Sequence, residues 1–256
     1  MQLTIHEQVV SHLRKTPMKI IIGIILATGL LFVYLNKKKH NPTESASENT
    51  KPANFYSIND GNQNELIISI EISQKWLDST KTKYDWNEFD EYDNRMWEYM
   101  YKLFDETVEK SGIKDNTELW NKLNREQKMF WAFLAFNGDT DNGGVYQFIF
   151  NRPEFIISVA ETWDELEMEE LKKDYKNVLF ELSGKSSKIS ELKTVFNDES
   201  KDWNKRWNSF SDGYNELKST EKIEGYYYDK EFKKKLYKKV ADRIENNIDN
   251  FATIVD

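Results

Sequence analysis

Residues 20–35 form an uninterrupted apolar run, and this run constrains the chain more than any other feature. They read IIIGIILATGLLFVYL, without one charged side chain. Counting from Met18 gives 18 positions, with Lys19 able to extend its amine to the membrane surface. About 20 apolar residues cross a bilayer as a helix, and no polar face is present that would suit a buried core helix. The run predicts a transmembrane helix over residues 18–36, with the lipid bilayer as its partner.

A cleaved signal peptide is the main alternative to this anchor. The apolar run is long for a signal peptide, and it ends in Tyr34-Leu35-Asn36-Lys37 without a pair of small residues for cleavage. Three Lys/Arg precede the run and three follow it, so the positive-inside count is a tie. Translation from Met18 instead of Met1 would favour a cytoplasmic C-terminal domain. We predict a single-pass membrane protein with a cytoplasmic domain, and both start sites stay open.

The anchor divides the rest of the chain into three parts. Residues 1–17 form a short N-terminal segment. Residues 37–60 include the small, polar and Pro-containing stretch HNPTESASENTKPAN, which is typical of a flexible linker. Residues 61–256 hold most of the 8 Trp, 13 Tyr and 15 Phe, so we expect a single folded domain there.

Residue types that are missing exclude several enzyme classes. The chain has no Cys, and its three His are His6, His12 and His40, all before the folded domain. Thiolate nucleophiles, Ser-His-Asp triads, histidine acid–base catalysis and most zinc or di-iron sites are therefore excluded from the domain. A hydrolase that uses paired carboxylates remains a less favoured alternative. We expect no enzyme, with no catalytic residue, cofactor or metal.

The domain is acidic. The net charge is −8 for the whole chain and −11 for residues 51–256. Such a surface repels nucleic acid and favours a basic protein partner, although solubility alone also explains it. The last predicted helix is rich in Lys, which could face anionic lipid or pair with the acids. The candidate partner-binding surface comprises Asp85, Glu88, Asp90, Glu91, Asp93, Glu165, Glu167, Glu169 and Glu170.

Apolar residues recur at helical spacing through the domain, and clear period-two strands are absent. The predicted fold class is therefore all-α, a single helical domain tethered to one N-terminal transmembrane helix. Helices are expected near residues 66–77, 97–108, 119–123, 129–136, 153–163, 171–182, 192–196, 203–210 and 229–251. The helix at 97–108 should end before Gly112.

The central helix has the clearest start signal. Asn124 followed by Gln127 predicts a capping box, and the segment Met129–Phe136 is apolar nearly all round, so it should lie in the core. We expect Asn137-Gly138 to end this helix. Asp141 or Asn142 would then cap the next one, with Gly143 and Gly144 allowing close backbone approach.

Asp139-x-Asp141 begins like a calcium-binding loop, but the pattern does not continue. With Asp139 at position 1, position 5 is Gly143 and position 12 is Phe150. A bidentate Glu is required at position 12, so the stretch predicts no calcium site.

The same stretch resembles the DNA mimic protein 19 C-terminal domain family over about residues 90–185. That family has an apolar aromatic helix, then a turn of the type Asn-Gly-Gly-aromatic-x-Gln-aromatic, then Asn. Val145 stands where a larger aromatic is usual, and Tyr146 directly precedes the Gln. The residues that match the motif, interpreted as structural, are Asn142, Gly143, Gly144, Gln147, Phe148 and Asn151.

The resemblance implies an all-α fold and an acidic surface that imitates the DNA phosphate backbone. The transmembrane helix departs from the usual soluble form of the family. Together with the charge, the resemblance favours a membrane-anchored acidic module that binds a basic protein without binding nucleic acid directly. A structural domain of the envelope that contacts lipid is the alternative.

Overall fold

The computed structural model describes residues 55–184, 188–196 and 210–256. The predicted transmembrane helix and most of the linker lie outside these ranges, as does the predicted helix at 203–210 apart from Phe210. Within them, no helix has both the length and the apolar character that crossing a membrane requires.

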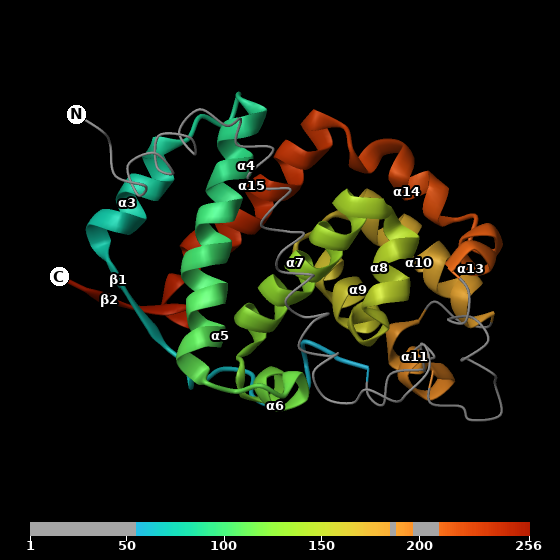
Figure 1. Cartoon of the computed structure of the whole chain (residues 1–256), viewed down its shortest axis with the longest axis horizontal. Coiled ribbons are helices and arrows are strands. Elements are labelled where there is room, and N and C mark those ends of the chain that lie inside the picture. The colour runs from blue at the N-terminus through green and yellow to red at the C-terminus, as the bar shows by residue number, and fades with distance from the viewer. Residues whose placement is uncertain (1–54, 185–187, 197–209) are drawn as a thin grey trace, which may run out of the picture. The chain divides into compact units, whose positions relative to one another are not determined.

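Helices dominate the described residues, as the all-α prediction expects, and Figure 1 shows them packed around α7. In chain order they are α3 (Gln74–Lys83), α4 (Phe89–Tyr99), the π-helix η1 (Met100–Asp105), α5 (Glu106–Ser111), α6 (Asn116–Lys122), α7 (Arg125–Gly143), α8 (Val145–Asn151), the 3-10 helix η2 (Pro153–Phe155), α9 (Ile156–Glu165), α10 (Glu169–Ser183), α11 (Ile189–Phe196), α13 (Phe210–Glu216), α14 (Thr220–Tyr227), α15 (Lys230–Asn246) and the 3-10 helix η3 (Ile248–Asn250).

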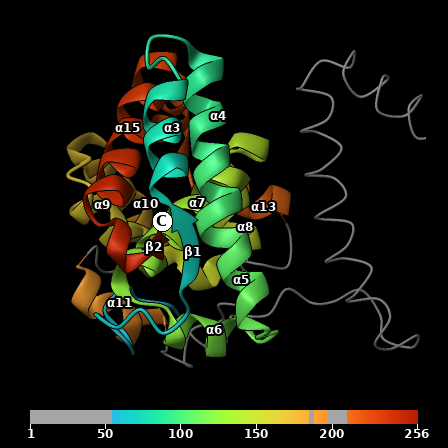
Figure 2. The ribbon, with the colours of Figure 1, turned by 90° about the vertical axis from the view of Figure 1, so that its left-hand side faces the viewer.

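A small parallel sheet is the part of the fold that the helical pattern did not predict. Strand β1 (Ile70–Ser73) pairs with β2 (Ala252–Val255), with Ile70 opposite Ala252 (Figure 2). The predicted helix at 66–77 is therefore wrong before residue 74. Ile70 and Ile72 alternate with polar neighbours and are both buried, but four residues are too few for the alternation to be evident in the sequence.

The C-terminal helix ends earlier than predicted. The predicted start is confirmed, since Asp229 caps α15 by accepting the backbone N–H of Phe232, but the helix stops at Asn246 instead of Phe251. Phe251 and Ala252 are buried, and the chain straightens there to form β2. Pairing with a distant strand therefore sets this boundary, and no local signal marks it.

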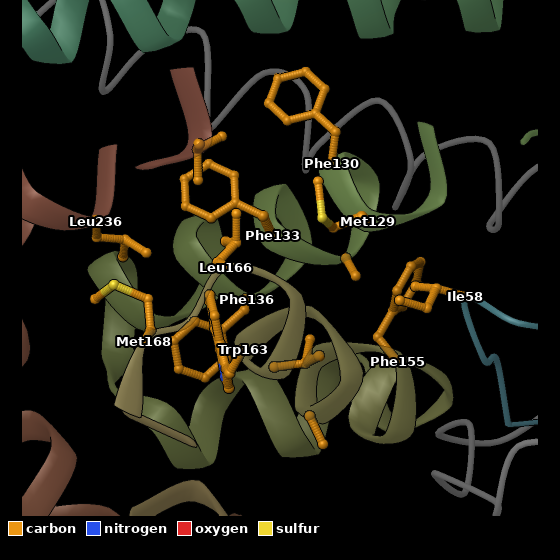
Figure 3. Close-up of a cluster of buried hydrophobic side chains, with 14 of the residues drawn as sticks. Ile58, Met129, Phe130, Phe133, Phe136, Phe155, Trp163, Leu166, Met168 and Leu236 are labelled. Carbon is orange, nitrogen blue, oxygen red and sulfur yellow. The ribbon is translucent and has the colours of Figure 1, made fainter. Parts of the chain in front are cut away.

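Helix α7 is the central element of the domain. Its capping box is confirmed, since Asn124 Oδ1 accepts the N–H of Gln127 at 3.0 Å and Gln127 Oε1 accepts the N–H of Asn124 at 3.2 Å. Phe130, Phe133 and Phe136 are buried, which also confirms its central position (Figure 3).

The predicted end of this helix at Asn137-Gly138 is wrong. Helix α7 continues to Gly143, and the N–H of Gly144 still bonds to the carbonyl of Thr140 at 2.9 Å. Gly138 has a helical environment with open space beside it. Asn137 does not end the helix because its side chain accepts hydrogen bonds from other helices, described below.

Phe136 joins five helices in one aromatic cluster. Its ring makes edge contacts with four others, at centroid distances of 5.1 Å to Phe148 and Trp163, 5.4 Å to Tyr227 and 5.9 Å to Tyr175. These rings come from α8, α9, α14 and α10 respectively. Edge-to-face pairs of this kind add to the gain from burial, so α7 holds the other helices together at this point.

Helices α4, η1 and α5 form one continuous helical rod, seen at the front of Figure 1. Gly112 ends it in the left-handed conformation with φ of 63°, which confirms the predicted stop. The six-residue π-helical turn was not predicted, because apolar spacing of three and four does not distinguish it from an α-helix.

Residues 55–60, which we assigned to the linker, include part of the core. Phe55, Tyr56 and Ile58 are buried. Polar contacts also hold this segment against the helices: the Glu161 carboxylate of α9 accepts the N–H of Ile58 at 2.8 Å, and Lys128 Nζ of α7 donates to the carbonyl of Asp60. The polar composition around these few apolar residues explains why the segment resembled a linker.

Alanine substitutions at Gly138 and Gly144 test where α7 ends. Replacing Gly138 with Ala should raise the free energy of unfolding by about 0.5–1 kcal/mol, because the site is helical and open. Replacing Gly144 with Ala should lower it by about 1–3 kcal/mol, because φ is 90° there and a Cβ would lie 2.5 Å from Glu224 Oε1. Urea unfolding followed by circular dichroism measures both. Equal effects of the two changes would contradict the position of the turn.

Candidate interaction surface

The turn between α7 and α8 is built by the glycines of the family-like motif. Gly144 adopts φ of 90°, and its backbone passes close to the Glu224 carboxylate, which accepts the N–H of Val145 at 2.8 Å. A Cβ on Gly143 would lie 1.8 Å from Gln147 Oε1, so the Gln side chain covers that glycine directly. Gly144 therefore requires glycine because of its positive φ, whereas a Cβ on Gly143 would displace the flexible Gln147 amide.

The other motif residues also make contacts within the domain. Phe148 is buried against Phe136, and Asn151 Nδ2 donates to Asp139 Oδ1 at 2.9 Å. Arg152 Nε lies 3.3 Å from the other oxygen of Asp139. Gly144 is the N-cap of α8, and Asp141 and Asn142 belong to the last turn of α7, so the predicted N-cap role of Asp141 or Asn142 is wrong. The motif fixes the angle between two helices, and its contacts are those of a structural element.

Sequence reasoning did not find a buried polar cluster just beside this turn. The side-chain oxygen of Asn137 accepts three hydrogen bonds, from Tyr227 Oη at 2.7 Å, Lys233 Nζ at 2.8 Å and Tyr237 Oη at 3.2 Å. Lys233 Nζ also lies 2.5 Å from Asp141 Oδ1 and 3.8 Å from the centre of the Tyr227 ring. This Asn137 cluster fastens α14 and α15 to the end of α7.

Lys233 is nearly inaccessible, with 5 % of its side chain exposed. Burial lowers the pKa of its amine to about 8, against the opposing attraction of Asp141. A lowered lysine pKa often marks a catalytic site, but a base or nucleophile must reach its substrate. Four side chains enclose this amine, so the cluster is suited to hold helices together. The sequence carries one signal for this cluster: Asn137 and Asp141, like Lys233 and Tyr237, are four residues apart and so lie on one side of their helix.

The first group of predicted acids lies around the beginning of α4. Asp85 and Glu88 are exposed, and Glu91 is partly exposed and accepts the N–H of Asp85 at 2.8 Å. Asp93 is partly buried on the same helix. Asp90 belongs to α4, but its side chain lies outside the described part of the structure.

The second group lies at the turn between α9 and α10, and it is partly neutralised. Glu165 pairs with Arg125 at 2.6 Å, and this contact lowers the pKa of Glu165. Glu167 is exposed with Lys239 at 3.8 Å, and Glu169 lies 3.8 Å from Lys172. Glu170 is exposed on α10.

Helix α15 packs against α4 and lies between α4 and the α9–α10 region (Figure 2). Arg243 lies 3.5 Å from Glu165 on one side, and Lys234 donates to Asn87 at 3.2 Å beside the first group. The structure therefore does not bring all nine predicted residues onto one acidic face. The Lys-rich helix pairs with the acids, which was one of the two alternatives left open by its sequence.

The excess acid is unevenly distributed along the chain. Residues 55–120 carry 15 Asp/Glu and 7 Lys/Arg, a net charge of −8. Residues 121–247 carry 24 Asp/Glu and 22 Lys/Arg, a net charge of only −2. The acidic part of the domain is thus the one that contains α3 to α6. Among the described residues, no group of three acids or histidines is arranged to hold a metal ion.

The nearly neutral part, residues 121–247, matches a known protein family. Residues 121–247 fit the family model described as DMP19-like protein. This part of the chain therefore matches the DMP19-like family, as the motif around Gly143 and Gly144 indicated. The match begins and ends later than the expected range of 90–185, and it includes the Asn137 cluster together with all of α14 and α15. No curated protein and no solved structure matches the chain.

The titration of Lys233 gives a test of the Asn137 cluster. Its pKa is about 8 in the fold and returns to about 10.5 on unfolding, so between these values the unfolded chain binds more protons and stability rises with pH. Lys233→Met removes this contribution. We expect the free energy of unfolding of the unmodified protein, relative to this variant, to increase by about 2 kcal/mol from about pH 7 to about pH 9.5.

Urea unfolding at the two pH values measures the difference, with Lys235→Met as the control on an exposed position of the same helix. The control should show no such change. A constant difference between the unmodified protein and Lys233→Met would show that the buried amine does not titrate in this range.

Proposed function

We propose that this chain is a membrane-anchored acidic module that binds basic protein surfaces in the manner of a DNA mimic. The DMP19-like family match and the net charge of the domain support the proposal. A basic DNA-binding surface is built to meet regularly spaced negative charge, and a surface rich in carboxylates competes for it. The module would not bind nucleic acid itself, because like charges repel.

The observation that carries the proposal is the net charge of −8 in residues 55–120. Most ion pairs of the second acidic group are made within the domain, whereas Asp85 and Glu88 are exposed at the start of α4. We therefore place the partner-binding surface on the α3–α6 part of the domain. In this proposal the chain has no catalytic residue, cofactor or metal.

A lipid-contacting envelope domain is the second candidate, based on the lysines of α15. Lys238 pairs with Asp242 at 3.0 Å, and Lys239 and Arg243 face Glu167 and Glu165. These contacts reduce the positive charge that is available to anionic headgroups, so we favour the protein-binding function.

Capture experiments test the proposed function. The full chain, held in phosphatidylcholine nanodiscs, should retain basic DNA-binding proteins from a cell extract and release them when duplex DNA or salt is added. Asp85→Asn/Glu88→Gln should weaken retention at least about threefold, because long-range attraction is reduced. Glu169→Gln/Glu170→Gln is the matched control with the same charge change. Partners that are neutral, or that stay bound in molar salt, would contradict the proposal.

Topology is a separate part of the proposal. We propose that residues 18–36 cross the membrane and that the domain is cytoplasmic, where DNA-binding proteins occur. A reporter fused after Asp256 should therefore be active in its cytoplasmic form and inactive in its exported form. Activity of the exported form would place the domain outside, where a DNA-mimic role has no target.

A further inference from the structure

The helical rod formed by α4, η1 and α5 displays an unusual pair of aromatic side chains. Its inner side is buried through Met96, Tyr99 and Leu103. On another side, Tyr101 is 46 % exposed and its ring lies 6.0 Å from that of the partly exposed Trp97. Large aromatic groups that stay exposed next to each other are typical of contact surfaces between proteins.

Two acids continue the same line along the rod. Trp97, Tyr101, Asp105 and Glu109 follow one another at intervals of four, so they lie on one side of the helix. Partial desolvation raises the pKa of the Tyr101 hydroxyl, and the charge of Asp105 raises it further, which shows that the two groups are close. We call these four residues the aromatic–acidic ridge. Its length, over 12 residues, is about 18 Å.

The charge of the ridge differs from that of the neighbouring line of residues. Glu98 pairs with Lys83 at 3.2 Å, and Lys102 pairs with Glu106 at 2.7 Å, so that line is neutralised. Asp105 and Glu109 are exposed, and neither forms a salt bridge with another described residue. An occupant of the ridge must therefore offer apolar contact at one end and positive charge at the other.

The local backbone is also unusual here. The π-helical turn Met100–Asp105 contains both Tyr101 and Asp105. Such turns are rare, are less favourable than a regular α-helix, and are found frequently at functional sites. The turn sets the position of the exposed Tyr101 ring relative to Asp105, whose carboxyl is partly desolvated, and this desolvation raises its pKa to about 6.

We propose that the aromatic–acidic ridge binds a basic amphipathic helix of a partner protein. Apolar side chains of that helix pack on Trp97 and Tyr101, and its Lys or Arg side chains reach Asp105 and Glu109. About three turns of helix fit along the ridge. This inference rests on the proposed function, because it takes the partner to be basic. It adds a defined contact site, which precedes the family-matched residues 121–247 in the chain.

A pair of peptides tests the proposal. The probe is a 20-residue peptide of Ala and Lys with three Leu at intervals of four, and its partner is a scrambled peptide of the same composition without an apolar side. Fluorescence anisotropy measures binding of each labelled peptide to the full chain in phosphatidylcholine nanodiscs, after subtraction of binding to empty nanodiscs. We expect at least tenfold tighter binding of the patterned peptide.

Variants then separate the two parts of the ridge. Tyr101→Ser should abolish the preference for the patterned peptide. Asp105→Asn/Glu109→Gln should weaken the binding of both peptides and reduce the dependence of that binding on salt. Phe180→Ser is the control, because Phe180 is 54 % exposed on α10. Circular dichroism melting checks that each variant is folded.

The outcomes distinguish this inference from the proposed function. If neither peptide binds, the proposed basic partner is contradicted together with the ridge. If both bind equally, or if Tyr101→Ser leaves the preference intact, the ridge alone is overturned. If sedimentation shows that Tyr101→Ser converts a dimer to a monomer, the ridge is a contact between copies of this chain and the inference is wrong.

Discussion

The convergence of three hydrogen bonds on Asn137 is the interaction on which the rest of the structure depends. Asn137 follows Phe136, so one turn of α7 provides both the aromatic contacts to four helices and the polar contacts to α14 and α15. Buried donors that lose their acceptor cost about 1–3 kcal/mol each, so the geometry of this turn is strongly specified. The turn at Gly144 then directs α8 back across the same cluster.

Placement of α15 has a consequence for charge. Lys233 holds α15 against α7. Further along the same helix, Arg243 lies beside Glu126 of α7 and Glu165 of α9, and Lys239 lies beside Glu167 in the turn after α9. Much of the positive charge of α15 is therefore paired with acids of the same domain, and the family-matched residues are close to neutral. The excess negative charge remains on α3 to α6, which precede the family match. Fold and proposed function thus reside in different parts of one domain.

Much of this arrangement could be predicted from local signals, but the contacts between distant residues could not. The Asn124–Gln127 capping box and the stop at Gly112 follow from short-range chemistry, and both were correct. The strand at Ile70 and the early end of α15 depend on pairing across the whole domain. Gly138 looked like a helix stop because the four-residue spacings of Asn137/Asp141 and Lys233/Tyr237 do not show that the two pairs, almost a hundred residues apart, meet. The acids at Asp85 and Glu165 could be identified as clusters, but not the helix that separates them.

Hydrogen exchange in an Asn137→Leu variant tests the central claim most directly. Leu has a similar size and lacks the side-chain amide, so Tyr227, Lys233 and Tyr237 lose their common acceptor. The account predicts that amides of α14 and α15 exchange much faster, while those of α9 and α10, which pack through Phe136, keep their protection. Unchanged protection of α15, or an equal loss in all helices, would contradict the role of Asn137 as the point that joins the C-terminal helices to the core.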